Sequence, residues 1–288
     1  MLSPTLARSW LFVPGDDARK IMHGARSEAD VAILDWEDGV LPANKAVARS
    51  VPWDADDFRR AGMRVLVRIN CRLSEWYEDD LKAFTRSAFN GVVLPKCESS
   101  DDVQNTLRVV EAFGGRPEFD IYPMIESPLG LLRGEAIVRS SANVKGLLFG
   151  AYDFCITSRI KPSPGEPELL MPRSMLVTIC RAHGVAAIDS PAVALEDTEL
   201  VDQAVCRSFQ SGFHGKLAIH PKHIPLIARV FSPTAEEVQR AEELLQQASV
   251  RQQGAFSWKG EMVDEAILKR ARYTIELSAV YRKRLTQG

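Results

Sequence analysis

Eight short apolar runs alternate with longer amphipathic stretches along most of this 288-residue chain. The runs cover residues 10–13, 31–35, 64–70, 91–95, 121–125, 146–149, 185–188 and 216–219. Such alternation predicts repeated βα units, and runs that are apolar on both faces are typical of parallel strands. We therefore predict a (β/α)8 TIM barrel, with a doubly wound open sheet as the alternative.

The chain continues beyond the eighth unit with a segment that a barrel does not need. Residues 232–250 predict a helix rich in Glu and Gln, residues 254–263 a hairpin that turns at Lys259 and Gly260, and residues 264–285 a last helix. We therefore expect the barrel over residues 1–231 and a helix–hairpin–helix extension over residues 232–288.

Composition limits the class of protein. The formal net charge is −2 with interspersed charges, which argues against nucleic acid or an anionic membrane as the main partner. The five cysteines form no Cys-x-x-Cys pair, and the first residues lack a basic segment followed by an apolar one. No apolar run has the length of a membrane span. We expect a soluble, cytoplasmic protein with small-molecule partners.

Charged residues at the ends of three predicted strands form the candidate site. Arg68 lies near the end of the third run, Glu126 follows the fifth, and Asp153 follows the sixth. Burying such charges costs free energy unless they share a site with opposite charge or a metal. Catalytic groups of barrels lie at the C-terminal ends of the strands. We therefore expect these three side chains to converge on one polar site.

Further charged residues follow the second and fourth strands. Glu37, Asp38 and Lys96 are expected at the same rim as the first three. Oxygen ligands that leave positions for water and substrate suit Mg2+ better than zinc or copper. Each acid taken alone is more simply a loop residue or a helix cap, as Asp38 could be. The joint placement of an arginine and two acids on three strands favours function instead.

The order of several motifs carries a family resemblance. The segments are RSWLFVPG (8–15), AILDWEDGV (32–40) followed by Lys45, VRIN (67–70), VLPK (93–96), PMIESP (123–128), LFGAYD (148–153), GKLAIHP (215–221) and MVD (262–264). Together they resemble the CitE-like branch of the HpcH/HpaI aldolase/citrate lyase superfamily, which includes the citrate lyase β chain and citramalyl- and malyl-CoA lyases. The resemblance spans nearly the whole chain.

The resemblance implies a Mg2+-dependent lyase that cleaves or forms a carbon–carbon bond beside a thioester carbonyl. It implies that Glu126 and Asp153 bind the metal, and that Arg68 contacts the substrate and the developing enolate oxygen. Asp264 would reach the active site of a neighbouring subunit, as in a homotrimer or a multiple of one. The predicted catalytic residues are Arg68, Asp264, Glu37 and Asp38, and the predicted substrate-binding residues are Arg68, Glu126, Phe12, Pro14, Arg19 and Lys96.

Two departures from the family pattern keep other functions open. Asp17 and His23 stand where relatives that use coenzyme A often carry Arg and Lys, with Arg19 and Lys20 as possible substitutes. Tyr152 stands where the family usually has an acid. The alternatives are an Mg2+-dependent aldolase on free 2-oxo or 2-hydroxy acids, a citrate lyase β subunit acting on a carrier-protein thioester, and a non-catalytic dicarboxylate-binding barrel. The acyl group, the carrier and the direction of the reaction stay open.

Overall fold

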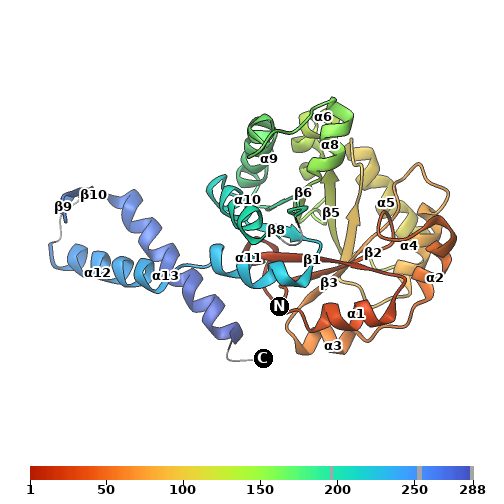
Figure 1. Ribbon diagram of the computed structural model, residues 1–288, viewed down its shortest axis with the longest axis horizontal. Helices are drawn as coiled ribbons and strands as arrows, with labels where there is room; N and C mark the ends of the chain where they lie inside the picture. Colours follow the sequence, from red (N-terminus) through yellow and green to blue (C-terminus); the bar gives the residue numbers. More distant parts are fainter. Residues whose placement is uncertain (195–196, 252–254, 286–288) are drawn as a thin grey trace. The chain divides into compact units, whose positions relative to one another are not determined.

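The computed structural model describes residues 1–194, 197–251 and 255–285. The chain divides into two compact units, Met1–Ala228 and Arg229–Gly288. In the described residues of the first unit, eight parallel strands pair in chain order, and β8 pairs with β1 to close the barrel (Figure 1). The strands are β1 (Ser9–Pro14), β2 (Val31–Asp35), β3 (Arg64–Arg68), β4 (Gly91–Leu94), β5 (Asp120–Ile125), β6 (Gly146–Phe149), β7 (Ala186–Asp189) and β8 (Gly215–Ala218). The predicted TIM barrel is confirmed.

Helices alternate with these strands. They are α1 (Ala18–Ala25), α2 (Lys45–Ser50), α3 (Ala55–Arg60), α4 (Tyr77–Thr85), α5 (Ser100–Ala112), α6 (Pro128–Leu132), α7 (Gly134–Arg139), α8 (Ala151–Ser158), α9 (Leu170–Ala182), α10 (Thr198–Gln210) and α11 (Ile224–Val230). Short 3-10 turns are η1 (Pro4–Leu6), η2 (Pro42–Asn44), η3 (Pro167–Leu169) and η4 (Pro221–His223).

The barrel interior is filled by at least one large apolar side chain from every strand. This layer comprises Trp10, Ile33, Leu66, Val93, Tyr122, Leu148, Ile188 and Leu217. The rings of Trp10 and Tyr122 meet edge to face with their centroids 5.0 Å apart. Side chains two residues apart share one face of a strand. Arg68, two residues beyond Leu66, is therefore placed above the apolar core at the C-terminal mouth of the barrel.

Local signals place the acids of the mouth where strands end and helices begin. Glu126 follows β5 directly, and Ser127 then accepts a hydrogen bond from the Gly130 backbone N–H to cap α6. Asp153 lies in the first turn of α8, where the helix dipole favours a negative charge. Two consecutive βα junctions thus direct carboxylates to the same end of the barrel.

The second unit consists of two long helices and a hairpin. These elements are α12 (Ala235–Arg251), β9 (Phe256–Trp258), β10 (Glu261–Val263) and α13 (Glu265–Leu285). β9 and β10 pair antiparallel, and Lys259 and Gly260 in the turn both have positive φ, 49° and 85°, as a two-residue hairpin turn requires. Gly254, the predicted start of the hairpin, lies outside the described residues. No helix in the described residues is both long and apolar enough to cross a membrane.

Candidate active site

A cavity of about 1080 Å³ is lined by residues that follow the C-terminal ends of several barrel strands. Of the residues predicted from the sequence, those that line it are Phe12, Asp38, Arg68, Glu126 and Asp153. The structure therefore brings the arginine and the two acids predicted to share a site to one cavity. The cavity also includes apolar residues from α8, from the segment after it and from α10.

Arg68 is held from two sides. Its Nε and Nη2 donate to the two carboxylate oxygens of Asp35 at 2.8 and 2.6 Å, and its guanidinium carbon lies 4.6 Å from the centre of the Phe12 ring. Burial alone would raise the pKa of Asp35, but the adjacent Arg68 guanidinium outweighs burial and lowers it. This fixed fork leaves the Nη1 edge of Arg68 for other partners.

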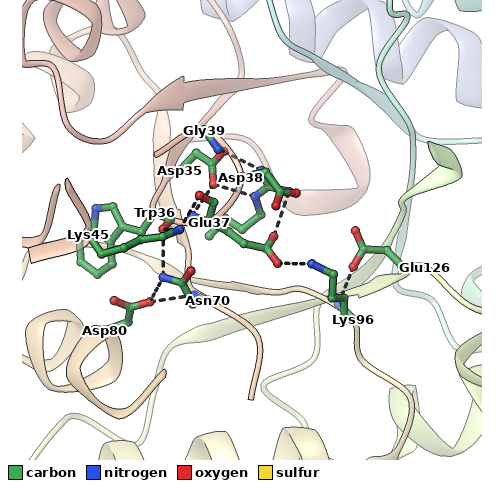
Figure 2. A network of polar contacts seen from close by, with 11 residues as sticks. Asp35, Trp36, Glu37, Asp38, Gly39, Lys45, Asn70, Asp80, Lys96 and Glu126 are labelled. Atoms are coloured by element: carbon green, nitrogen blue, oxygen red, sulfur yellow. Dashed lines mark hydrogen bonds and ion pairs between the residues drawn. The ribbon is translucent and has the colours of Figure 1, made fainter. Parts of the chain in front are cut away.

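Glu37 and Asp38 lie on the Nη1 side of Arg68. One carboxylate oxygen of Glu37 lies 3.2 Å from Nη1, and the other accepts a 2.7 Å hydrogen bond from Lys96 Nζ (Figure 2). Burial raises the pKa of Glu37, and the neighbouring Asp38 adds to this effect. Asp38 lies 3.5 Å from Nη1 with a side chain that is 60% exposed, so it contributes a weaker, solvent-screened charge.

Lys96 connects Glu37 to Glu126. Its backbone is in the left-handed region with φ of 50°, an uncommon conformation outside glycine that often marks functional sites. In this conformation its backbone N–H donates to Glu126 Oε2 at 2.5 Å while its side chain reaches Glu37 (Figure 2). Burial, then the charges of Glu37 and Asp153, raise the pKa of Glu126 to about 8. Burial and the neighbouring carboxylates therefore both disfavour the ionised form of Glu126 at this point of the rim.

This donor set fits a divalent cation bound by two carboxylates. Among the described residues no group of three or more His, Cys, Asp or Glu side chains is arranged to hold a metal ion. Glu126 and Asp153 alone would be the protein ligands, and water and substrate would fill the other positions, as is usual for Mg2+. Burial and the charges of Glu37 and Asp153 disfavour the ionised form of Glu126, and a cation bound there would stabilise it. The residues present thus fit Mg2+.

A second layer of polar contacts holds the loop after β2. Lys45, which is buried, donates to the backbone carbonyls of Trp36 and Glu37 at 2.8 and 2.6 Å (Figure 2). The Asn70 side chain also donates to the Trp36 carbonyl, at 2.9 Å, and to Asp80 at 2.7 Å. These contacts fix the loop that carries Glu37.

The sequence reasoning did not assign roles to Asp35, Lys45 or Asp80. The available signal for Asp35 was its position at the end of a strand that neighbours β3, since Asp35 and Arg68 are register partners across the parallel pair. Lys45 was part of the motif after β2. The spacing of that motif did not show that the Lys45 ammonium group turns back to the loop carbonyls.

Besides Glu37 and Lys96, whose contacts are described above, three further predicted site residues are not among those that line the cavity. Pro14 ends β1 opposite Asp35 in the register and is not among the described residues that line the cavity. Arg19 is also absent from that lining, and its side chain is 87% exposed, 3.9 Å from Asp17. Asp264 lies in the second unit, where its carboxylate accepts the Ile267 N–H at 3.1 Å and caps α13. Their predicted roles stay predictions.

Comparisons with known proteins agree with this architecture. Residues 8–221 match the family model described as HpcH/HpaI aldolase/citrate lyase. Citrate lyase subunit beta of Escherichia coli (strain K12) is 32% identical over 285 residues, which cover 95% of this chain and 94% of that protein. Human mitochondrial citramalyl-CoA lyase is 30% identical over 292 residues, covering 94% of this chain and 85% of that protein.

A solved structure extends the likeness to three dimensions. CitE of Mycobacterium tuberculosis, crystallised with magnesium, acetoacetate and coenzyme A, is 26% identical to this chain. The superposition gives a TM-score of 0.80 and covers 96% of this chain and 99% of CitE. The chain therefore belongs to the HpcH/HpaI aldolase/citrate lyase family, in its CitE-like branch.

Proposed function

We propose that this protein is a Mg2+-dependent carbon–carbon lyase that cleaves or forms a 3-hydroxyacyl thioester of the citryl, malyl or citramalyl type. The observation that carries the proposal is the convergence of Arg68, Glu126 and Asp153 on one cavity. A CitE-like relative binds magnesium, acetoacetate and coenzyme A together, which supports both the metal and the substrate class.

Arg68 supplies the charge stabilisation that this reaction needs. Cleavage of a 3-hydroxyacyl thioester removes a proton from the hydroxyl group and develops negative charge on the thioester enolate oxygen. Because Asp35 fixes two nitrogens of Arg68, its remaining edge is already oriented when the enolate forms. Such a preorganised donor lowers the barrier by about 3–4 kcal/mol.

Glu126 and Asp153 would hold Mg2+. The metal would act as a Lewis acid that polarises an oxygen of the 2-oxo acid half and orients it. Lys96 holds Glu126 in place through its backbone N–H and Glu37 through its ammonium group. Glu37 and Asp38 set the negative charge beside Arg68 and are the proposed participants in proton transfer.

Asp264 would complete the site from a neighbouring copy of the chain in a homo-oligomer, a trimer or a multiple of one. This step rests on the family resemblance. Mixing two inactive variants tests it: Arg68→Met and Asp264→Asn proteins, unfolded together and refolded, should regain activity that neither has alone. Asparagine preserves the cap of α13. No regained activity would count against a shared site.

The central assay uses the isolated chain with Mg2+ and citramalyl-, malyl- or citryl-CoA, and measures release of acetyl-CoA and the 2-oxo acid. Arg68→Lys should lower kcat roughly 100-fold or more, because lysine keeps the charge but loses the planar fork. Arg139→Lys, on the exposed face of α7 with its side chain 69% exposed, is the matched control and should leave kcat unchanged. Equal activity of Arg68→Lys and wild type would contradict the proposal.

One observation favours a second candidate, an aldolase acting on free 2-oxo or 2-hydroxy acids. Arg19, the substitute cation for a coenzyme A phosphate, lies in the first turn of α1, where it is exposed and faces Asp17. The same assay with free citramalate, malate and citrate separates the two candidates, and activity on the free acids alone would favour the aldolase. A citrate lyase β subunit would be active only with its carrier protein.

A further inference from the structure

The cavity continues from the catalytic rim to a second polar cluster between β7, β8 and α9. Asp189 is its centre: it accepts hydrogen bonds from Arg173 Nε at 3.0 Å, Lys216 Nζ at 3.1 Å and Ser208 Oγ at 2.5 Å. Lys216 donates further to the Ser190 carbonyl at 2.6 Å and to Ser208. The two basic side chains of this cluster are buried, since those of Arg173 and Lys216 are only 8% and 2% exposed.

Two guanidinium groups of this cluster already converge on one carboxylate oxygen. Glu166 Oε2 accepts a 2.8 Å hydrogen bond from Arg173 Nη2 and lies 3.8 Å from Arg207 Nη2. Glu166 stands in a Pro/Gly-rich loop with φ of 55°, a strained conformation for a residue with a side chain. The geometry thus defines a position for an oxyanion, and a loop side chain occupies it.

The charge at this end is not balanced by Glu166. Arg173, Arg207 and Lys216 line the cavity as cations and pair with two carboxylates, Glu166 and Asp189. Three cations that share two carboxylates leave one positive charge in excess among the paired groups, and Lys161 also lines the cavity. Such an excess around a buried cluster attracts an anionic ligand group.

Apolar residues line the rest of this part of the cavity. They come from α8, from the segment after it, from the segment after β7 and from α10: Ile156, Ile160, Pro162, Val193, Leu200 and Ala204. A ligand that runs from the catalytic rim to the basic cluster would pass these side chains. Its middle part should therefore be largely apolar, and its far end should carry a negative charge.

We propose that Arg173 and Arg207 form an oxyanion subsite that binds the charged far end of the thioester substrate. In the free protein the Glu166 carboxylate occupies this subsite. The shared chemistry is an oxyanion on an extended arm. It is either the phosphate of a phosphopantetheine arm or a carboxylate at the end of a long acyl group. The proposal rests on the thioester lyase function proposed above, and it places the arm away from Arg19.

Isothermal titration calorimetry with three probes tests the subsite in the full chain: 4′-phosphopantetheine, pantetheine, which lacks the phosphate, and adipate, a dicarboxylate. Arg207→Ala should weaken binding of 4′-phosphopantetheine about tenfold, as expected for loss of a charge-assisted contact, and leave pantetheine unchanged. Glu166→Gln should strengthen the same ligand several-fold, because it removes the competing carboxylate. Arg207 is partly exposed on α10, so the alanine variant should fold, and its thermal unfolding is measured alongside.

The responses of the three probes to these substitutions identify the source of the oxyanion and can overturn the proposal. If adipate shows this pattern and 4′-phosphopantetheine does not, the subsite is supported with an acyl carboxylate as its ligand. The proposal is overturned if neither anion responds to Arg207→Ala and Glu166→Gln, or if Arg19→Ala causes the loss instead. Titration of Mg2+ and pyruvate into wild type and Arg207→Ala distinguishes a failure of the lyase centre from a failure of the subsite. No binding to wild type overturns the lyase centre. Binding to both proteins shows that any effect of Arg207→Ala on the anionic probes concerns the subsite alone.

Discussion

Asp35→Asn is the change that most directly tests how Arg68 is held. Each carboxylate oxygen of Asp35 accepts two N–H donors: Oδ1 from Arg68 Nε and the Glu37 backbone, Oδ2 from Arg68 Nη2 and the Gly39 backbone. An asparagine of the same shape must point its NH2 group at one of these donor pairs. Either orientation therefore breaks two hydrogen bonds and leaves the buried guanidinium without its counter-charge.

The expected magnitudes follow from that geometry. Removing one partner of a buried ion pair destabilises a protein by about 3–5 kcal/mol. Glu37 and Asp38 still lie 3.2 and 3.5 Å from Arg68 Nη1, which offsets part of the loss and favours about 3 kcal/mol. Misplacement of the Arg68 donor should lower kcat roughly 100- to 1,000-fold.

Urea unfolding and the thioester cleavage assay measure the two effects in one protein. The matched control is Asp120→Asn. Asp120 pairs with Arg64 at the opposite end of the barrel, with side chains 14% and 21% exposed, so the same chemical change should lower stability without lowering kcat. Unchanged stability and activity in Asp35→Asn would refute the reasoning, as would an equal loss of activity in Asp120→Asn.

Three further predictions concern the metal and the pH dependence. In Gly150→Ala the new Cβ would overlap Glu126 Cγ, so Mg2+ affinity measured by calorimetry should fall without any change of charge; unchanged affinity would show that Glu126 is not a ligand. Mg2+ should raise the Tm of wild type and chelation should reverse the rise, whereas a Glu126→Gln protein that still responds to Mg2+ would count against this site. His214 accepts the Ala187 N–H, and burial, aided by Arg181, lowers its pKa to about 4. Because the unfolded imidazole titrates near 6.5, its contribution is present above that pH. It is lost between pH 6.5 and about 4, by about 3 kcal/mol at most. A His214→Gln protein whose unfolding free energy depends on pH as steeply as that of wild type would disprove this.

The barrel could be predicted from the sequence because each strand has a local sequence pattern that identifies it. An apolar run that is buried on both faces needs no long-range information, and the run at 146–149 coincides with β6. The run predicted at 64–70 is longer than β3, which ends at Arg68. Beyond that point the chain turns so that Asn70 reaches Asp80, a partner ten residues away that periodicity does not reveal.

Only the charged residues at the ends of apolar strands could be predicted as members of the site. Arg68, Glu126 and Asp153 stand out because burying a charge there costs free energy unless it has a partner or a ligand. The contact of Arg68 with Asp35 depends on strand register, and the pairing of Glu166 with Arg173 and Arg207 depends on the path of a loop. Neither of these long-range geometries has a local sequence signal.

The most direct test of the lyase centre is a crystal structure with Mn2+ in place of Mg2+ and with pyruvate, read by the anomalous signal of the metal. A single peak ligated by Glu126 and Asp153, with pyruvate bound to it and Arg68 beside the ligand, is the predicted result. A metal bound elsewhere, or a substrate position out of reach of Arg68, would contradict the proposed active site.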